Sequence, residues 1–168
     1  MKIAAEDAGL SRGVMFMVEI ETRAEAQTRL VGRIVADILV ERGGGVVALS
    51  GELGAGKTVF VKGMAEELGI DPRDVVSPTF VLAMRHEGAA VLWHLDAYRL
   101  NSEQFMLSCG DAFEEEGIVA VEWANRVEAA LPQDRVNVEI EHRGERRRVV
   151  RISADSDFEA LLRQRLAR

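Results

Sequence analysis

The feature that most constrains the fold of this sequence is the stretch VVALSGELGAGKTVF, residues 46–60. Within it, residues 51–58 read GELGAGKT and fit the pattern G-x-x-x-x-G-K-[ST]. Glycines allow positive φ, so such a loop can turn tightly and bring consecutive N–H groups close to phosphate oxygens. The apolar run before the loop is typical of a strand buried on both faces of a parallel sheet. The apolar spacing after it predicts a helix.

Lysine is scarce in this chain, with 3 lysines against 18 arginines, yet a lysine stands at position 57 of the loop. The residue frequencies give the pattern by chance in roughly one of several hundred chains of this length. We therefore expect a phosphate site rather than a strand-to-helix turn that matches by accident. Lys57 is expected to reach the β- and γ-phosphates, and the Thr58 hydroxyl to bind Mg²⁺. The helix that begins near Lys57 would direct its positive dipole end at the same place.

A loop of this kind needs a carboxylate near the metal, usually at the end of another strand. Two acids follow apolar runs: Asp96 after VLWHL and Glu122 after IVAV. Ligands of open α/β sheets gather at the carboxyl ends of strands, so both acids could face Mg²⁺ or the attacking water. Either could instead be a surface acid that ends a strand. The segment SPTF, residues 77–80, adds two hydroxyls in a proline-stiffened loop, or is an ordinary loop.

Helical and strand patterns alternate along the chain, which predicts an α/β fold. We expect a P-loop NTPase-like three-layer domain with a mixed, partly parallel sheet and an antiparallel C-terminal hairpin. Strands are predicted at 15–21, 46–50, 118–123, on both sides of the Glu87-Gly88 turn within 80–96, and on both sides of Arg143-Gly144. Helices are predicted after Thr22, after the glycine loop, at 101–116 and at 155–167.

The first helix carries two finer predictions. Thr22 followed by Glu25 matches a capping box, with Thr22 as the N-cap. Apolar residues at helical spacing predict one buried face, made of Leu30, Ile34, Val35, Ile38 and Leu39. In the helix after the loop, Phe60, Met64 and Leu68 share that spacing, and Gly69 follows as a plausible C′ residue.

Composition excludes several classes of protein. The net charge of −7 argues against a protein that simply coats nucleic acid. A single cysteine, Cys109, excludes an internal disulfide and a cysteine-cluster metal site, and packing is the simplest role for its thiol. The chain has no run of about 18 apolar residues and no apolar signal segment near its start, so we expect a cytoplasmic protein without a membrane span.

Five segments, taken together, resemble a known family. They are GELGAGKTVFVKG, VSPTFVL, WHLDAYRL, VAVEWANRV and LPQDRVNVEI, in the order in which that family has them. The chain is similar, over residues 17–153, to the ATPase of bacterial tRNA threonylcarbamoyladenosine biosynthesis, the TsaE (YjeE) family. The glycine loop alone is generic, whereas SPTF, HLDAYRL and EW together with it are specific.

The resemblance implies a small P-loop α/β domain that hydrolyses ATP with Mg²⁺ and works with two partner proteins of the TsaB and TsaD type. Those partners transfer a threonylcarbamoyl group to the adenosine next to the anticodon of certain tRNAs, so tRNA is expected as an indirect partner. Residues 15–168 would form a single P-loop ATPase domain, preceded by a loose extension over residues 1–14.

Roles for individual residues follow from the matching motifs. Thr58 and Glu122 would ligate Mg²⁺, and Lys57 and Asp96 would be catalytic, with Asp96 positioning water. Trp123 would lie near the nucleotide. The loop residues that would bind the nucleotide are Gly51, Gly54, Ala55, Gly56, Lys57, Thr58 and Val59. Two departures, Ala97 and the segment SCGDAF at 108–113, look like packing changes that leave this chemistry intact.

Two other functions remain open at this stage. A small-molecule kinase could have this size and loop, and would need an acceptor pocket and usually an arginine-rich lid. Arginines 143, 146, 147, 148 and 151 could be such a lid, but they alternate with strand residues and favour a solvated hairpin face or a binding surface. Arg99 is a candidate arginine finger or a structural contact.

The second of these other functions is a nucleotide switch, in which ATP binding alone drives assembly and hydrolysis is incidental.

The histidines show no metal-ligand spacing. His94 could face the site because it lies two residues before Asp96, but a core or edge position is the simpler expectation.

Overall fold

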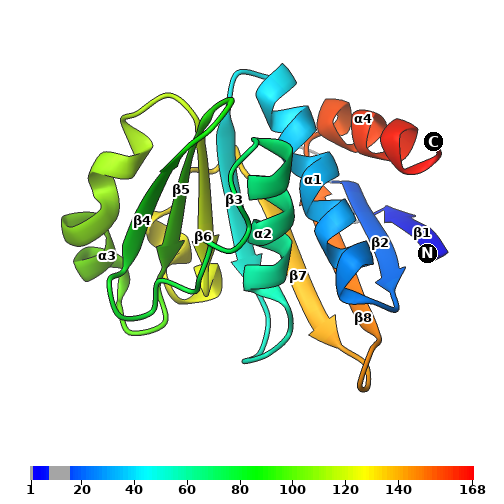
Figure 1. The fold of residues 1–168 in the computed structure, drawn as a ribbon, viewed down its shortest axis with the longest axis horizontal. Helices are drawn as coiled ribbons and strands as arrows, with labels where there is room; N and C mark the ends of the chain where they lie inside the picture. Colours follow the sequence, from blue (N-terminus) through cyan, green and yellow to red (C-terminus); the bar gives the residue numbers. More distant parts are fainter. Residues whose placement is uncertain (1, 8–15) are drawn as a thin grey trace.

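The computed structural model describes residues 2–7 and 16–168. Their eight strands form one sheet in the order β1-β2-β8-β7-β3-β6-β5-β4 (Figure 1). The strands are β1 Lys2–Asp7, β2 Phe16–Thr22, β3 Gly45–Ser50, β4 Ala83–Glu87, β5 Val91–Asp96, β6 Ile118–Glu122, β7 Val136–His142 and β8 Arg148–Ala154. The helices are α1 Glu25–Glu41, α2 Lys57–Glu67, α3 Ser102–Cys109 and α4 Ser156–Leu166, with short 3-10 turns at η1 Gly110–Phe113, η2 Ala124–Arg126 and η3 Glu128–Ala130.

Strand β3 lies at the centre of the parallel part of the sheet. It pairs in parallel with β6 on one side and with β7 on the other, and β6 pairs in parallel with β5. All other pairings are antiparallel, including the β7–β8 hairpin. Four consecutive buried residues in β3 explain its unbroken apolar run. The predicted fold class, with its mixed sheet and C-terminal hairpin, is therefore confirmed.

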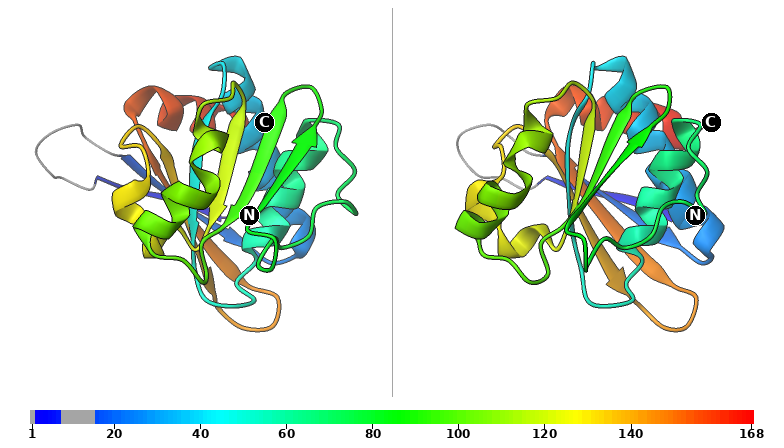
Figure 2. Two further views of the ribbon diagram at one scale, coloured as in Figure 1. Left: turned by 90° about the vertical axis from the view of Figure 1, so that its left-hand side faces the viewer. Right: turned by 60° about the vertical axis from the view of Figure 1, so that its left-hand side comes forward.

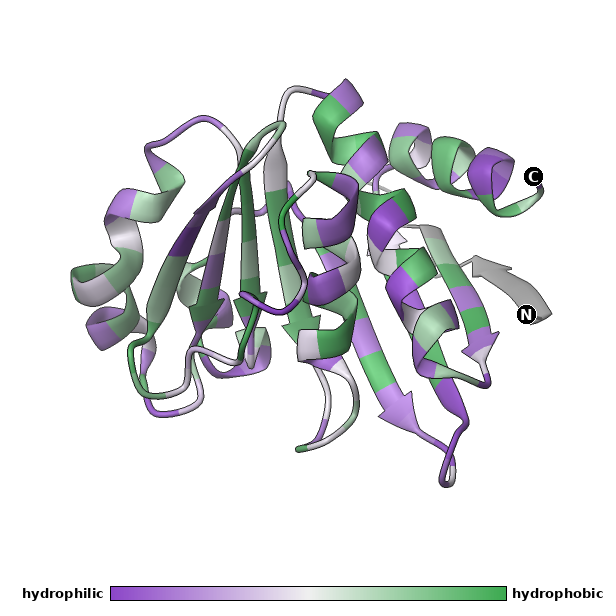
Figure 3. Cartoon of the chain, viewed as in Figure 1, coloured by the Kyte–Doolittle hydropathy of each residue, from purple (hydrophilic) through white to green (hydrophobic). Residues whose placement is uncertain are grey.

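Helices cover both faces of the sheet (Figure 2). One apolar cluster joins α1, α2 and α4 to one face, and a second joins α3 and the 3-10 turns to the other face of β3, β5 and β6. Hydropathy follows this layering: β6 is buried throughout and apolar up to its last residue, Glu122, whereas β7 alternates between apolar and polar side chains (Figure 3). The layers leave the carboxyl ends of β3, β5 and β6 together at one edge.

Glycines let α1 and α2 approach each other closely. A Cβ on Gly32 of α1 would lie 2.2 Å from the carbonyl oxygen of Phe60, and a Cβ on Gly63 of α2 would lie 2.0 Å from that of Arg29. Backbone oxygens cannot move away as a flexible side chain can, so both positions require glycine. This contact fixes the position of α2, whose first residue is Lys57.

We expect Gly63→Ala to lower the free energy of unfolding by roughly 1–3 kcal/mol through overpacking. Alanine is favoured over glycine by about 1 kcal/mol in a helix interior, so helix propensity alone predicts the opposite sign. Urea denaturation of both proteins measures the change. Gly110→Ala is the matched control, because a Cβ there would meet only the Met106 side chain, at 3.5 Å. Equal stabilities of the Gly63 and Gly110 variants would contradict the close-contact explanation.

The predicted capping box of α1 is wrong. Ala24 occupies the N-cap position and makes no side-chain cap. Thr22 is instead the buried last residue of β2, and its hydroxyl forms a 3.0 Å hydrogen bond with that of Thr28. The Gln27 side chain accepts the Arg23 N–H at 2.7 Å. Strand β2 thus ends at Thr22, one residue later than predicted, so Thr22 belongs to the sheet and does not cap the helix.

The predicted buried face of α1 is only partly correct. Val35, Ile38 and Leu39 are buried, but Leu30 is 44% exposed and its neighbour Val31 is fully buried. The buried face is rotated because α2 packs against the small Gly32 and not against a row of large side chains.

The expectation of a loose N-terminal extension over residues 1–14 is wrong for Lys2–Asp7. These residues form β1, which pairs antiparallel with β2 from Lys2 opposite Glu21 to Asp7 opposite Phe16. The pairing satisfies backbone groups that β2 would otherwise expose as an edge strand. Residues 1 and 8–14 of the predicted extension lie outside the described residues.

Candidate functional site

The loop between β3 and α2 has the backbone conformation that its glycines predict. Gly51, Gly54 and Gly56 all have positive φ, at 139°, 76° and 114°. A Cβ on Gly51 would lie 2.3 Å from the carbonyl oxygen of Ile140 in β7, so the sheet itself requires glycine there. Ala55 is fully buried beneath the turn. The helix α2 begins at Lys57, so its first N–H groups point into the space that the loop encloses.

Lys57 folds back over the loop and is only 4% exposed. Its Nζ donates to the carbonyl oxygens of Gly51 at 2.7 Å and Glu52 at 2.9 Å, and lies 3.8 Å from the centroid of the Trp123 ring. Burial lowers the pKa of Lys57, and the nearby carboxylates of Glu122 and Asp96 oppose that shift. The ammonium thus lies in a partly desolvated position beside two acids, where it can attract an anion strongly.

Glu122 stands at the end of β6 and is 3% exposed. Its Oε1 accepts a hydrogen bond from the Thr58 hydroxyl at 2.7 Å and lies 2.8 Å from Nε2 of His94. In the parallel pairing of β5 with β6, Glu122 lies directly opposite Asp96. The register of the two strands therefore brings both predicted acids to one place.

Asp96 is buried and held by three donors. Its Oδ2 accepts from the hydroxyls of Ser77 at 3.2 Å and Thr79 at 2.8 Å, and its Oδ1 accepts the backbone N–H of Tyr98 at 2.8 Å. The SPTF segment is therefore more than a connection, because both of its hydroxyls orient this carboxylate.

A cavity of about 330 Å³ connects these groups. Its lining residues come from the loop, the start of α2, the SPTF segment and the ends of β5 and β6: Leu53, Gly54, Gly56, Lys57, Thr58, Val59, Ser77, Thr79, Tyr98, Glu122 and Trp123. Gly51, Ala55 and Asp96, which were also predicted for the site, lie behind this wall. Gly51 contributes its carbonyl to Lys57, and Asp96 is covered by the two hydroxyls.

The aromatic wall of the cavity has a strained backbone. Trp123 has φ 60° and ψ 33°, a left-handed conformation that is uncommon for a large side chain. Its ring lies 4.8 Å from that of Tyr98, and the guanidinium of Arg126 lies 5.2 Å from the Tyr98 ring. Strain of this kind costs on the order of 1–3 kcal/mol and clusters at functional sites.

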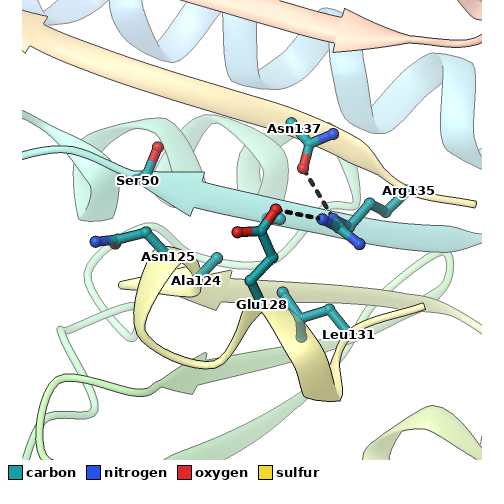
Figure 4. Close-up of a pocket in the computed structure, with 8 residues that line it drawn as sticks. Ser50, Ala124, Asn125, Glu128, Leu131, Arg135 and Asn137 are labelled. Carbon is teal, nitrogen blue, oxygen red and sulfur yellow. Dashed lines mark hydrogen bonds and ion pairs between the residues drawn. The ribbon is translucent and has the colours of Figure 1, made fainter. Parts of the chain in front are cut away.

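A second hollow, of about 100 Å³, lies on the other side of β3 (Figure 4). Arg135 reaches back there to donate to Asn137 at 2.8 Å and pairs with Glu128 at 3.3 Å. These contacts occupy the guanidinium within the protein, and the volume is less than a third of that of the larger cavity. Of these two hollows, the cavity lined by the glycine loop, Lys57 and Glu122 is therefore the better candidate for a nucleotide.

Tyr98 was not predicted as a site residue, and a position of His94 facing the site was only the less favoured alternative. His94 is fully buried, so the expected core position is confirmed, and its Nε2 also lies 2.8 Å from Oε1 of Glu122. The signal was its position two residues before Asp96, which places both side chains on the same face of β5. The candidate finger Arg99 stacks instead over Phe80, at 4.9 Å.

The donor set at the cavity fits a magnesium ion that arrives with phosphates. Within residues 2–7 and 16–168, no group of three or more His, Cys, Asp or Glu side chains could hold a metal alone. Mg²⁺ in nucleotide sites commonly takes one or two protein oxygens and completes its shell with phosphates and water. The Thr58 hydroxyl and the Glu122 carboxylate, 2.7 Å apart on the cavity wall, offer such oxygens.

The fold and the loop define a small P-loop α/β domain, with a glycine loop between the central parallel strand β3 and helix α2, and with acids at the ends of β6 and β5. The chain belongs to the family described as "Threonylcarbamoyl adenosine biosynthesis protein TsaE", whose model matches residues 22–150.

Relatives in several bacteria support this membership. The tRNA threonylcarbamoyladenosine biosynthesis protein TsaE of Bacillus subtilis is 36% identical over 143 residues, which cover 84% of this chain and 89% of the relative. The protein of the same name from Treponema pallidum is 38% identical over 121 residues, covering 71% and 87% of the two chains. The crystal structure of YdiB from B. subtilis superimposes with a TM-score of 0.75 at 31% identity, covering 93% of this chain and 97% of that one.

Among the helices of the described residues, none combines the length and apolarity needed to cross a membrane.

Proposed function

We propose that this chain is an Mg²⁺-dependent ATPase that supports threonylcarbamoyl modification of the adenosine next to the anticodon in tRNA. In this proposal the chain acts in the cytoplasm with protein partners of the TsaB and TsaD type, and tRNA is an indirect partner. The observation that carries the proposal is the convergence of Lys57, Thr58 and Glu122 on one cavity, in a chain of the TsaE family.

Phosphate binding follows from the loop. Its N–H groups, from Gly54 to Val59, would wrap the phosphate oxygens, and the N-terminus of α2 adds the positive end of its dipole. Lys57 would reach the β- and γ-phosphates by releasing the carbonyls of Gly51 and Glu52, which it binds in this structure. Because its ammonium is already desolvated, a phosphate replaces weak acceptors with a charged one.

Thr58 and Glu122 would hold the Mg²⁺ ion, which when bound neutralises phosphate charge. Phosphoryl transfer depends mainly on positioning and on charge stabilisation, so these residues and Lys57 would supply most of the electrostatic contribution.

Asp96 would orient the attacking water. Three donors fix its carboxylate, so its remaining lone pairs have a defined direction. In this structure Ser77 and Thr79, which line the cavity, cover Asp96, so a bound nucleotide would have to displace their hydroxyls before Asp96 could contact the water. Trp123 and Tyr98 would flank the nucleotide.

The rival functions have less support. The hairpin arginines that could form a kinase lid are paired with nearby acids: Arg143 with Glu141, and Arg151 with both Glu19 and Glu141. Arg148 donates instead to the backbone carbonyl of Ala55 in the glycine loop. These contacts within the protein favour structural roles for the three arginines over a lid that closes on an acceptor. A switch without required hydrolysis stays open as an alternative, and the Asp96 variant treated in the Discussion decides between the two.

Calorimetry on the full chain tests the proposal. Titration with a nonhydrolysable ATP analogue is expected to give tight uptake with Mg²⁺ and much weaker uptake without it. Uptake that does not depend on Mg²⁺, or no uptake at all, would overturn the proposal. ADP release with and without small-molecule acceptors separates the ATPase from a kinase.

We expect slow hydrolysis by the chain alone and faster turnover with its partners. Among the described residues, no arginine lines the cavity, so a second cation to stabilise the transition state would have to come from outside. An arginine supplied in this way contributes about 10³–10⁵-fold in related phosphoryl transfers. Steady-state phosphate release, measured with and without the partner proteins, gives the comparison. A high kcat for the isolated chain would contradict this expectation.

A further inference from the structure

We propose that His94 is a positioning residue: it fixes one oxygen of Glu122 and thereby leaves the other directed at the metal. The inference rests on the proposed function, because it assigns a role toward the Mg²⁺ that the proposed ATPase requires. His94 does not line the cavity and would touch neither nucleotide nor metal.

Two hydrogen bonds converge on a single atom of Glu122. The Thr58 hydroxyl and Nε2 of His94 approach Oε1 from 2.7 Å and 2.8 Å. Within the described part of the chain, the other carboxylate oxygen, Oε2, makes no hydrogen bond, and Glu122 lines the cavity. With Oε1 held by two donors, the carboxylate cannot rotate freely. Oε2 is then the oxygen that is free to meet a cation.

The tautomer of His94 follows from this contact. A carboxylate can only accept, so Nε2 carries the proton and donates it to Glu122. Nδ1 is then left as a buried nitrogen without a partner in the structure. An unpartnered buried polar atom costs roughly 1–3 kcal/mol.

Packing alone does not account for a histidine at this place. His94 is fully buried, and the surrounding positions on the same face of β5 and β6 are Leu92, Ile118 and Ala120. An apolar side chain of similar size would fill the same volume without leaving Nδ1 unpaired. The hydrogen bond to Glu122 is the feature that an apolar residue could not provide.

Residues that orient metal ligands in this way matter for affinity. Loss of such a partner typically costs 10–100-fold in metal affinity or activity. When His94 is replaced, we expect the loss of affinity to affect only the Mg²⁺-dependent part of nucleotide binding. The glycine loop and Lys57 would bind phosphate whether or not His94 is present.

The experiment compares three variants of the full chain with the wild-type protein. His94→Leu removes the donor and keeps the side chain apolar. In His94→Gln, the amide N–H lies near the former position of Nε2 and can still donate to Glu122. In His94→Asn, the side chain is too short for its amide to reach Glu122. For each, calorimetry gives the dissociation constant of a nonhydrolysable ATP analogue with and without Mg²⁺. We define the magnesium gain as the dissociation constant without Mg²⁺ divided by the dissociation constant with Mg²⁺.

We expect the magnesium gain of His94→Leu and His94→Asn to fall about 10-fold or more, and that of His94→Gln to stay within about threefold of wild type. Affinity without Mg²⁺ should be unchanged in all three. An unchanged gain in His94→Leu, or equal losses in the Gln and Asn variants, would overturn the inference. If His94→Leu does not fold, the Gln and Asn pair decides alone.

The same measurements distinguish failure of the proposed function from failure of the role of His94. If the wild-type chain shows no magnesium gain, the proposed function fails. If wild type shows the gain and the His94 variants all retain it, the ATPase stands and only the positioning role is lost. A purely structural role for His94 would lower the thermal unfolding temperature of the variants and leave the magnesium gain unchanged.

Discussion

Replacing Lys57 by alanine is expected to reduce kcat for ATP hydrolysis by roughly 10²–10³-fold, the usual cost of removing one charge-stabilising donor. Nucleotide binding should weaken as well, since the phosphates would lose the ammonium as a partner and the negative charge of the nearby Glu122 and Asp96 would no longer be offset. Phosphate release and calorimetry on the same preparations measure the two effects.

We expect the Lys57→Ala protein to lose activity without a comparable loss of stability. Burial lowers the pKa of Lys57, which means that the folded protein disfavours the charged lysine relative to the unfolded chain. Removing the lysine removes that desolvation cost, but it also removes the hydrogen bonds to the carbonyls of Gly51 and Glu52 and leaves Glu122 and Asp96 without a nearby cation, so the unfolding temperature is expected to change little. Lys62→Ala, in the same helix, is the matched control. If both lysine variants hydrolyse ATP at the wild-type rate, the cavity is not the ATP site.

Asp96→Asn is expected to lower hydrolysis by about 10²–10⁴-fold, the range for a positioned proton acceptor, and to leave nucleotide affinity nearly unchanged. The amide keeps the size of the side chain and can still accept from the N–H of Tyr98, but it loses the negative charge that would hold and activate water. Single-turnover hydrolysis and calorimetry separate the two effects.

The same variant decides whether turnover matters for the tRNA modification. Formation of threonylcarbamoyladenosine in a reconstituted reaction is expected to stop with Asp96→Asn. Continued modification by a protein that binds but does not hydrolyse ATP would favour the switch. Asp111→Asn, at an exposed position in η1, is the matched control. A loss of nucleotide binding in Asp96→Asn would contradict the assigned role, since Asp96 does not line the cavity.

Features that depend on neighbouring residues were predictable from the sequence. The glycine loop, the apolar run of β3 and the acids that end β5 and β6 are each encoded in a few consecutive residues. Their convergence then follows from the general rule that parallel strands end at one edge of a sheet. The Gly69 terminus of α2, with φ 74°, is confirmed for the same local reason.

Features that depend on distant residues were not predictable. Thr22 has the local pattern of a helix cap, but a strand pairing and a hydrogen bond to Thr28 override it. The partner of His94 lies 28 residues away, and Arg148 of the hairpin donates to the carbonyl of Ala55 from 93 residues away, at 3.1 Å. No spacing rule identifies such contacts, because they depend on the register of strands that are not adjacent in the chain.

The position of Trp123 also gives the protein a built-in optical reporter. The chain has two tryptophans, and the other, Trp93, donates its indole N–H to Glu115 at 2.8 Å outside the cavity. In a Trp93→Phe protein, all indole emission would come from the ring that stacks against the Lys57 ammonium. Any ligand that draws that ammonium away would change the emission, so occupancy of the cavity could be followed in real time without a label.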